Sequence, residues 1–578
     1  MKHGAYIFLA CVIVFALFVR TATFSYIGLD DAAYTFRNPF VASGLSVSNV
    51  VEAFSNFRHG GIWMPVTYIS YMVDASFSRM TGIPLIGWMH FVNVILHVLN
   101  FLLLWKLLCV LCGSPEGKAL PQSTPSASLP RQLSTIVAAL AAMIWAIHPL
   151  RVEPVAWIAA RKELLWSLFA LCGLVCWIGW CAQRSSLNRR LTTIFCLLAC
   201  LSKPTAMCFP LLAALVEWRG RRVDASVLGK AMGLRSQALR YMPLVTIAAA
   251  TAAIAAYSQT HIAGQGATAL YAASFAHRLV NALSSIGFYL RSAVWPVGLH
   301  VDCRAIPSLW PIGAAWDFLA LAVAVMATAG IIVVGRHRHS TADSSQLPTA
   351  IIFSASWFLL SLLPTLGLFG SFGIEAHADR FAYLPTMAFS FILLIPLSSA
   401  AGRNRSSSLI LPLAIILSLS VVTFRQLSYW RDDATAHGRA LACDPQHPRA
   451  MVHVADSLCS RRHDFDGGIS LYRKALSLSG TVPEGGFNVP DVQARLAYAL
   501  ASRGLPGDFQ EIKRLGAKVL SDFRNDRRGM MLDALGTAFM HDGDLKRAAL
   551  LFKASIEAPD RFWPKAPTIR KLQRCKSM

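Results

Sequence analysis

The chain has 578 residues, of which 55% are hydrophobic and only 15% are charged, and its mean hydropathy is +0.48. A water-soluble globular protein of this length is not normally so apolar, so the composition indicates an integral membrane protein and excludes a soluble enzyme, a fibre and a disordered scaffold. The formal net charge is +23, and much of the excess falls in short loops and in the C-terminal region. Such a distribution favours anionic lipid, and not nucleic acid, as a partner.

Apolar segments fill the first three quarters of the chain, and most of them are about long enough to cross roughly 30 Å of hydrocarbon. They lie at residues 5–20, 89–112, 133–148, 163–182, 190–201, 205–217, 242–257, 281–296, 316–335, 350–369, 382–400 and 409–424. The basic loops alternate, as cytoplasmic loops should, if the N-terminus is inside and residues 281–296 form a re-entrant or surface helix. The sequence therefore predicts about eleven spans, with the long loop 28–88 and the C-terminal region on the outer side.

The pattern changes near residue 425, after which charged residues are frequent and no further spanning segment follows. We therefore predict an all-α membrane domain over residues 1–424 and a helical repeat domain over residues 425–578. The spacing of small and aromatic residues in the second domain is close to that of tetratricopeptide repeats. The best copy contains Leu535, Gly536, Phe539, Gly543, Asp544, Ala548, Phe552 and Pro559, and two weaker copies precede it. Such a solenoid either presents a concave surface to a peptide or partner protein or packs as a cap on the membrane domain.

Asp30 and Asp31 follow the first apolar segment directly, at the expected outer water boundary. Partial burial and mutual repulsion would raise the pKa of one of these carboxyl groups, which suits a general base that accepts a proton from a hydroxyl. The alternative is a solvated loop or a helix N-cap. In the same loop, Asp74 and Arg58 are as consistent with an ion pair as with contact to a substrate.

Charged residues also gather at two other expected turns on the outer side, where charges beside membrane spans are costly to keep without a use. The first cluster contains His148, Arg151, Glu153, Trp157, Arg161, Lys162 and Glu163. The second contains Glu375, His377, Asp379, Arg380 and Tyr383, and Lys203 is a further candidate. Arg and Lys at such places suit the phosphate of a lipid. They are equally consistent with snorkelling to any anionic lipid or with ion-paired caps on helix ends.

The sequence contains no motif typical of a metal or nucleotide site. His148, His377, Asp30 and Asp31 could in principle supply ligands to a divalent ion, but they have no metal-binding spacing. There is no pair of CxxC motifs, and there is no HExxH, P-loop or GxGxxG motif. We therefore expect no metal and no cofactor, and transport driven by nucleotide hydrolysis is disfavoured.

Five segments carry a family resemblance. They are Leu29-Asp30-Asp31 with Asn38-Pro39, Trp63 to Asp74, His148 to Lys162, Lys203-Pro204, and Ala378 to Pro385. Together with the trailing repeats they resemble the transmembrane and tetratricopeptide-repeat family of protein O-mannosyltransferases and its bacterial relatives. That family is similar to the GT-C glycosyltransferases. Met64 departs from the pattern, since many relatives have a His before the proline of this motif.

The resemblance implies an enzyme of the bacterial inner membrane that takes a sugar, with mannose as the candidate, from a polyprenyl phosphate at the outer face. Asp30 or Asp31 would deprotonate a hydroxyl of an exported protein that the repeats hold on the periplasmic side. The departing phosphate would be stabilised by Arg161, Lys162, Lys203 or Arg380. The substrate pocket would include His148, Arg151, Glu153 and Asp379.

Two other hypotheses remain open. One is a non-catalytic membrane scaffold whose repeats recruit envelope-assembly partners, and it predicts that loss of Asp30 and Asp31 leaves function intact. The other is a GT-C enzyme that acts on a lipid-linked glycan, for which deletion of residues 440–578 would spare the chemistry.

Overall fold

The structure is a computed structural model, and every regular element that it describes is helical. It describes residues 2–56, 62–111, 131–183, 185–223, 234–261, 274–301, 315–337, 346–368, 377–403, 410–481, 487–520, 527–558 and 565–577. The chain divides into two compact units, Met1–Asp432 and Asp433–Met578, here called unit 1 and unit 2. They part close to the change of composition near residue 425.

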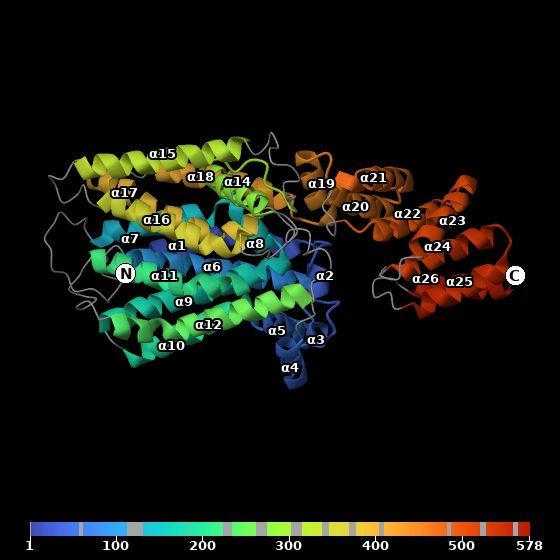
Figure 1. Ribbon diagram of the computed structural model, residues 1–578, viewed down its shortest axis with the longest axis horizontal. Helices are drawn as coiled ribbons and strands as arrows, with labels where there is room; N and C mark the ends of the chain where they lie inside the picture. Colours follow the sequence, from blue (N-terminus) through green and yellow to red (C-terminus); the bar gives the residue numbers. More distant parts are fainter. Residues whose placement is uncertain are drawn as a thin grey trace. The chain divides into compact units, whose positions relative to one another are not determined.

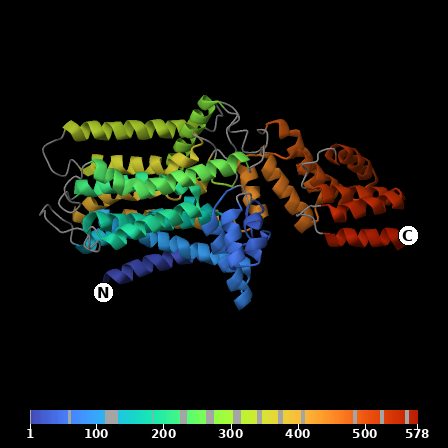
Figure 2. The same ribbon diagram turned by 60° about the horizontal axis from the view of Figure 1, so that its bottom comes forward.

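Unit 1 is a bundle of long helices that run side by side in both views of the ribbon (Figures 1 and 2). Most residues of these helices are apolar, as expected for elements that lie in lipid or in a membrane bundle. The long helices are α1 (Lys2–Phe18), α6 (Leu85–Leu111), α7 (Arg131–Ala146), α9 (Arg161–Gln183), α10 (Ser186–Ser202), α11 (Phe209–Val223), α12 (Leu234–His261), α15 (Ala315–His337), α16 (Gln346–Leu362), α17 (Ala388–Arg403) and α18 (Ile410–Ser428).

Four helices between α1 and α6 gather at the end of the bundle that lies away from the N-terminus (Figures 1 and 2). They are α2 (Asp31–Tyr34), α3 (Pro39–Ala42), α4 (Val47–Ser55) and α5 (Pro65–Thr81). Each of the last three starts where its sequence favours it, because Asn38 and Ser46 cap α3 and α4 with their side chains and Pro65 opens α5. This end of unit 1 also holds α8 (Val152–Ala156) (Figure 1).

The expected count of about eleven spans is wrong for the described residues, which contain six helices long and apolar enough to cross a membrane. These are Gly4–Thr23, Leu85–Leu111, Ile158–Gln183, Gln237–Ser258, Leu347–Thr365 and Ile410–Ser428. A seventh span results if Ser134–Ala146 and Pro149–Ala156, which meet at a bend of 64°, are counted as one. The chain is therefore a multi-pass membrane protein, and its described residues contain fewer candidate spans than its apolar segments suggest.

The difference has a physical cause, because apolar composition does not report helix length. Helices α10 and α11 have only 17 and 15 residues, and about 20 residues are needed to cross the hydrocarbon. Residues 281–296 fall largely in α14 (Phe275–Val294), which is not among the candidate spans.

Unit 2 is helical throughout its described residues, as the sequence predicts. Its helices are α19 (Asp433–Cys443), α20 (Pro448–Ser457), α21 (Phe465–Ser477), α22 (Val489–Arg503), α23 (Pro506–Leu520), α24 (Arg528–His541), α25 (Leu545–Glu557) and α26 (Lys565–Ser577). Each contacts the next along the chain. Small residues allow these contacts: a Cβ on Gly536 would lie 2.6 Å from the ring of Phe552, and one on Gly516 would lie 2.6 Å from Leu535. The predicted Gly and Phe positions of the best repeat thus meet between α24 and α25.

Candidate functional site

Asp31 is a fully buried carboxyl group that holds two segments of backbone together. The N–H of Ile27 donates to its Oδ2 at 2.8 Å, and the N–H of Ala159 donates to its Oδ1 at 2.7 Å. Burial raises its pKa to about 7, against the opposing effect of these two N–H groups. Both oxygens are therefore engaged in joining the start of α2 to the segment before α9.

Asp30 stands at the N-cap position of α2, yet its side chain makes no capping hydrogen bond. It is only half-buried. Burial, followed by the charge of Asp30, raises the pKa of Tyr34 and of Tyr68, which places both phenols near this carboxylate. Among the acidic groups, Asp30 also exerts the largest attraction on Lys162. Asp30 is thus the less buried carboxylate of the adjacent pair.

Lys162 is a buried cation on the first turn of α9, and it meets aromatic rings instead of a carboxylate partner. Its Nζ lies 4.7 Å from the ring centre of Tyr34 and 5.9 Å from that of Trp157. Among the residues that the structure describes, it makes no ion pair or hydrogen bond. A buried and unpaired ammonium group is costly, which is typical of a site that completes its charge balance with a ligand.

Lys203 and Arg380 are also buried, but each has a carboxylate partner. Lys203 directly follows α10 and pairs with Glu163. Arg380 lies on the 3₁₀ helix Asp379–Ala382 and pairs with Glu153, whose Oε1 is 2.5 Å from Nη1 and whose Oε2 accepts from the backbone N–H of Arg380 at 2.9 Å. Burial lowers the pKa of Lys203, and Glu163 acts in the opposite direction.

Two aromatic rings join these cations into one group. The Arg380 guanidinium lies 4.9 Å from the ring centre of Trp157 and 4.8 Å from that of Phe381. Lys203 lies 4.8 Å from the Phe381 ring, and Lys162 contacts Trp157. We call Lys162, Lys203 and Arg380 the cationic cluster. Its members come from three chain segments and converge beside Asp30.

Arg161 does not join this cluster, although it is adjacent to Lys162 in sequence. Its guanidinium pairs with Asp74 of α5, donates from Nε to Oδ1 of Asn93 at 2.8 Å and donates from Nη2 to the carbonyl of Met89 at 2.8 Å. The side chain is completely buried. Arg161 therefore ties α5 and α6 to the start of α9. The other suggested partner of Asp74, Arg58, lies outside the described residues.

His148 contacts backbone groups, and Arg151 donates to a backbone carbonyl and to a side-chain hydroxyl. The Nδ1 of His148 accepts from the N–H of Leu150, and its Nε2 lies 3.2 Å from the carbonyl oxygen of Ala293 on α14. Arg151 donates to the carbonyl oxygen of Tyr383 at 2.8 Å and to the hydroxyl of Thr386 at 2.5 Å. Both residues hold the bend after α7 against neighbouring segments.

Asp379 is a buried carboxyl group beside Arg380. Its Oδ1 has no hydrogen-bond partner among the described residues, and burial together with the nearby charge of Glu153 raises its pKa. Its sequence neighbour His377 packs against the ring of Phe288 at 3.9 Å, while Glu375 lies outside the described residues. Asp379 and Glu153 thus border the cationic cluster.

The sequence did not predict the contacts of the site that join residues far apart along the chain. Phe381 was not singled out by itself, and Glu163 was not recognised as the partner of Lys203, 40 positions away. The signal available was charge balance, because several buried cations need carboxylates or aromatic faces nearby. Met64 is fully buried at the start of α5.

No family model matches the chain. Among curated proteins it is similar to Protein O-mannosyl-transferase F38B6.6 of Caenorhabditis elegans, with 24% identity over 436 residues that cover 74% of this chain and 54% of that protein. It is also similar to Protein O-mannosyl-transferase TMTC4 of Homo sapiens, with 22% identity over 445 residues that cover 70% of this chain and 56% of that protein. The chain is a distant homologue of these proteins and spans about half their length.

Proposed function

We propose that this chain is a membrane glycosyltransferase that moves a sugar, with mannose as the candidate, from a polyprenyl phosphate to a hydroxyl group of a protein. The observation that carries the proposal is the cationic cluster beside the half-buried carboxylate of Asp30, at one end of the membrane unit. Cations suit the phosphate of the donor, and the carboxylate suits the proton of the acceptor. The distant homology to named protein O-mannosyltransferases supports the same reading.

In the proposed reaction the acceptor oxygen attacks the anomeric carbon of the sugar from the side opposite the phosphate. The new C–O bond forms as the bond from that carbon to the phosphate oxygen breaks, and the lipid phosphate departs with the electron pair. Asp30 takes the proton of the acceptor hydroxyl. The displacement inverts the anomeric centre and needs no cofactor, since the lipid-linked sugar is itself the activated substrate.

The cations contribute unequally to this step. Lys203 and Arg380 already face Glu163 and Glu153, so part of their charge is neutralised. Lys162 has only aromatic contacts and the attraction of Asp30, so it carries the uncompensated charge that a departing phosphate requires. Removing one preorganised donor of this kind typically slows an enzyme about 100-fold to 1,000-fold.

The acceptor and the location of the enzyme follow from the same proposal. A protein acceptor suits the helical unit 2, for which we propose a tetratricopeptide-like solenoid that holds the polypeptide. The site would face the outer side of a bacterial inner membrane, with unit 2 on the periplasmic side. Membrane lipids and the lipid-linked sugar are the further partners.

The experiment that tests this function measures sugar transfer from radiolabelled polyprenyl-phosphate mannose in membranes that contain the full chain. Asp30→Asn and Lys162→Gln should each abolish most of the transfer at equal expression. The matched controls are Glu52→Gln, on an exposed position of α4, and Lys106→Gln, on an exposed position of α6. They should retain it. Equal transfer in all variants, or none in the wild type across several donor sugars, would refute the proposal.

A further inference from the structure

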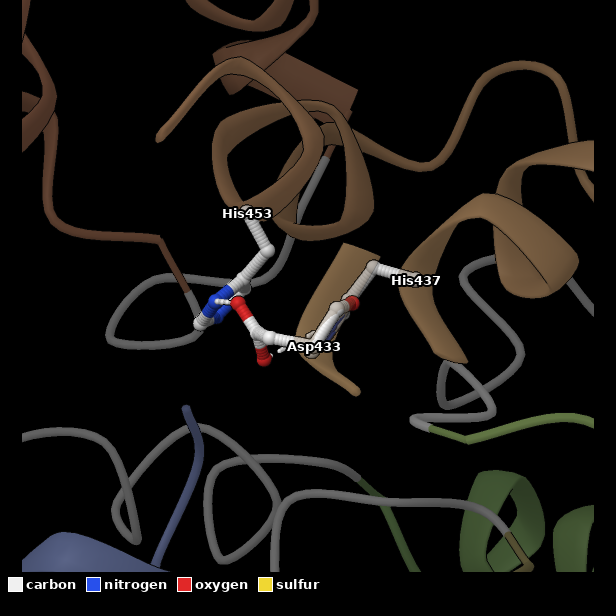
Figure 3. Close-up of side chains that lie close together, drawn as sticks. All are labelled: Asp433, His437 and His453. Atoms are coloured by element: carbon white, nitrogen blue, oxygen red, sulfur yellow. Dashed lines mark hydrogen bonds and ion pairs between the residues drawn. The ribbon is translucent and has the colours of Figure 1, made fainter. Parts of the chain in front are cut away.

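We infer that unit 2 contains a binding site for a divalent transition-metal ion such as Zn²⁺, formed by Asp433, His437 and His453. None of these three residues belongs to the candidate active site, and the metal site plays no part in the proposed transfer reaction. Figure 3 shows the three side chains turned toward one another from two helices. Their potential ligand atoms all lie within 4.8 Å of one another.

Helix geometry brings the three ligands together. Asp433 and His437 are four residues apart on α19, so their side chains lie on the same face of that helix. His453 comes from α20, which packs against α19. Two side chains at this spacing on one helix can bind an ion together with a residue from a neighbouring helix. The three ligands come together only when the unit is folded.

The separations suit a small ion. Nδ1 of His437 is 3.2 Å from Oδ1 of Asp433, and Nδ1 of His453 is 3.4 Å from Oδ2 of Asp433. Two ligands at ~2.0–2.1 Å from a tetrahedral zinc ion are about 3.3 Å apart. Two imidazoles with one carboxylate form a donor set that zinc and other first-row transition ions accept, whereas magnesium and calcium prefer oxygen alone.

Access also fits a bound ion. The His437 side chain is completely buried, while the side chains of Asp433 and His453 keep 17% and 18% of their surface exposed, which provides an entry path.

One rearrangement accompanies binding. The two imidazole rings are stacked, with centres 3.9 Å apart and planes inclined by only 12°. An ion bound to an imidazole nitrogen lies in the plane of that ring, so it cannot lie in both of two nearly parallel planes. One ring must turn about its Cβ–Cγ bond, a broad torsion in His, when the ion is bound.

The bound ion would join α19 to α20 at the beginning of unit 2. Three protein ligands leave a fourth position of a tetrahedral ion open to water or to another donor group. Since the ion binds only the folded arrangement, it stabilises this helix pair by mass action.

The test uses the full chain in detergent, stripped of metal and then equilibrated with Zn²⁺ buffered by a chelator. The wild type should bind one more ion per chain than His453→Gln or Asp433→Asn at the same free Zn²⁺ concentration. Loss of a ligand should weaken the affinity by more than the roughly 10-fold to 100-fold that loss of a supporting hydrogen bond causes. The control is His463→Asn, an exposed position with φ of 54° that Asn tolerates, and it should bind Zn²⁺ like the wild type.

Circular dichroism shows whether each variant folds. If a variant does not fold, spectra of the metal-loaded wild type still test the proposal. Wild-type chain loaded with Co²⁺ should show visible d–d absorption that Zn²⁺ displaces, and X-ray absorption at the metal edge should show two imidazole ligands. Equal Zn²⁺ content in the wild type and in a folded ligand variant would overturn the inference. An X-ray absorption spectrum of the Co²⁺-loaded wild type that shows no imidazole ligands would also overturn the inference.

Discussion

Asp30 and Asp31 are adjacent carboxyl groups with different surroundings. Asp31 points into unit 1, where both of its oxygens accept backbone N–H groups, while Asp30 stays half-buried among tyrosines. A carboxylate whose oxygens are both occupied is poorly placed to take a proton from a substrate. The two residues therefore divide the work, with Asp31 supporting the fold and Asp30 proposed as the base.

The first prediction concerns stability. In Asp31→Asn the amide has only one acceptor oxygen, so either the N–H of Ile27 or that of Ala159 loses its partner. A buried donor without an acceptor costs about 1–3 kcal/mol, so we expect a lower unfolding temperature for Asp31→Asn and an unchanged one for Asp30→Asn. Thermal unfolding of the two purified variants checks this. Equal midpoints of thermal unfolding for the two variants would contradict the prediction that only Asp31 stabilises the fold.

The second prediction concerns pH. The pKa of Asp31 rises from 3.8 in an unfolded chain to about 7 in the folded one, chiefly through burial. At a pH between these two pKa values, the folded chain binds more protons than the unfolded chain. The contribution of Asp31 to the free energy of unfolding is therefore full at low pH and is lost as the pH rises through about 7. The gap in unfolding temperature between the wild type and Asp31→Asn should thus narrow from about pH 5 to about pH 8. A gap that stays constant would contradict this.

At the scale of the helices, the two neighbouring cations at the start of α9, Arg161 and Lys162, make different contacts. Arg161 joins α9 to α5 and α6 through Asp74, Asn93 and Met89. Lys162 turns toward Tyr34 and Trp157. One helical step, about 100° around the axis, separates a structural ion pair from the cation that we propose contacts the donor phosphate.

The third prediction compares the two cations directly. Arg161→Met leaves Asp74 buried without its partner, and breaking a buried ion pair in this way costs about 3–5 kcal/mol. Lys162→Met removes a buried charge that has no ion-pair partner among the described residues, so it should leave the unfolding temperature unchanged or higher while transfer is lost. Thermal unfolding and sugar transfer, measured on both variants, separate the effects. Similar destabilisation by both would argue that Lys162 is also structural.

The fourth prediction tests how the helices of unit 2 approach each other. A Cβ at Gly536 would lie 2.6 Å from the Phe552 ring, so Gly536→Ala should force α24 and α25 apart and destabilise unit 2 by about 1–3 kcal/mol. Gly507→Ala is the control, because nothing lies within 4 Å of a Cβ on that residue of α23, and Ala favours a helix more than Gly does. Chemical denaturation monitored by helix content measures both. A harmless Gly536→Ala would show that the pair is not tightly packed.

At the scale of the whole molecule, the two compact units suggest a division of labour. Unit 1 holds all the residues of the candidate active site, and unit 2 begins at Asp433. The proposed transfer chemistry can therefore be tested separately from the proposed recognition of an acceptor protein.

The fifth prediction follows from that division. A chain shortened to residues 1–432 should still release or transfer the sugar to a small hydroxyl compound but should lose most transfer to protein. The measurement compares radiolabel in the two kinds of product, with full-length Asp30→Asn as the inactive control. Undiminished transfer to protein would show that unit 2 is not needed for substrate recognition. It would favour a lipid-linked glycan as the acceptor or a regulatory role for the repeats.

The amino-acid sequence by itself determined the membrane character of this protein, the helical nature of both regions and the distant relationship to protein O-mannosyltransferases. The first two properties depend on composition and local periodicity along the chain, whereas the third rests on the resemblance of the five motif segments and on the sequence similarity to the curated relatives. The sequence also identified candidate residues, because charged groups beside apolar helices are costly to keep; they include Asp30, Asp31, Arg161, Lys162, Lys203 and Arg380.

Only the tertiary structure decided how those candidates are paired. Arg161 meets Asp74 across 87 positions and Arg380 meets Glu153 across 227, and no local pattern encodes such separations. It also showed that several apolar segments form helices of 15 to 17 residues, and it brought His453 of α20 to Asp433 and His437 of α19. Packing between distant helices selects the partner of each buried charge, because a buried charge is stable only where a complementary group lies within a few ångströms.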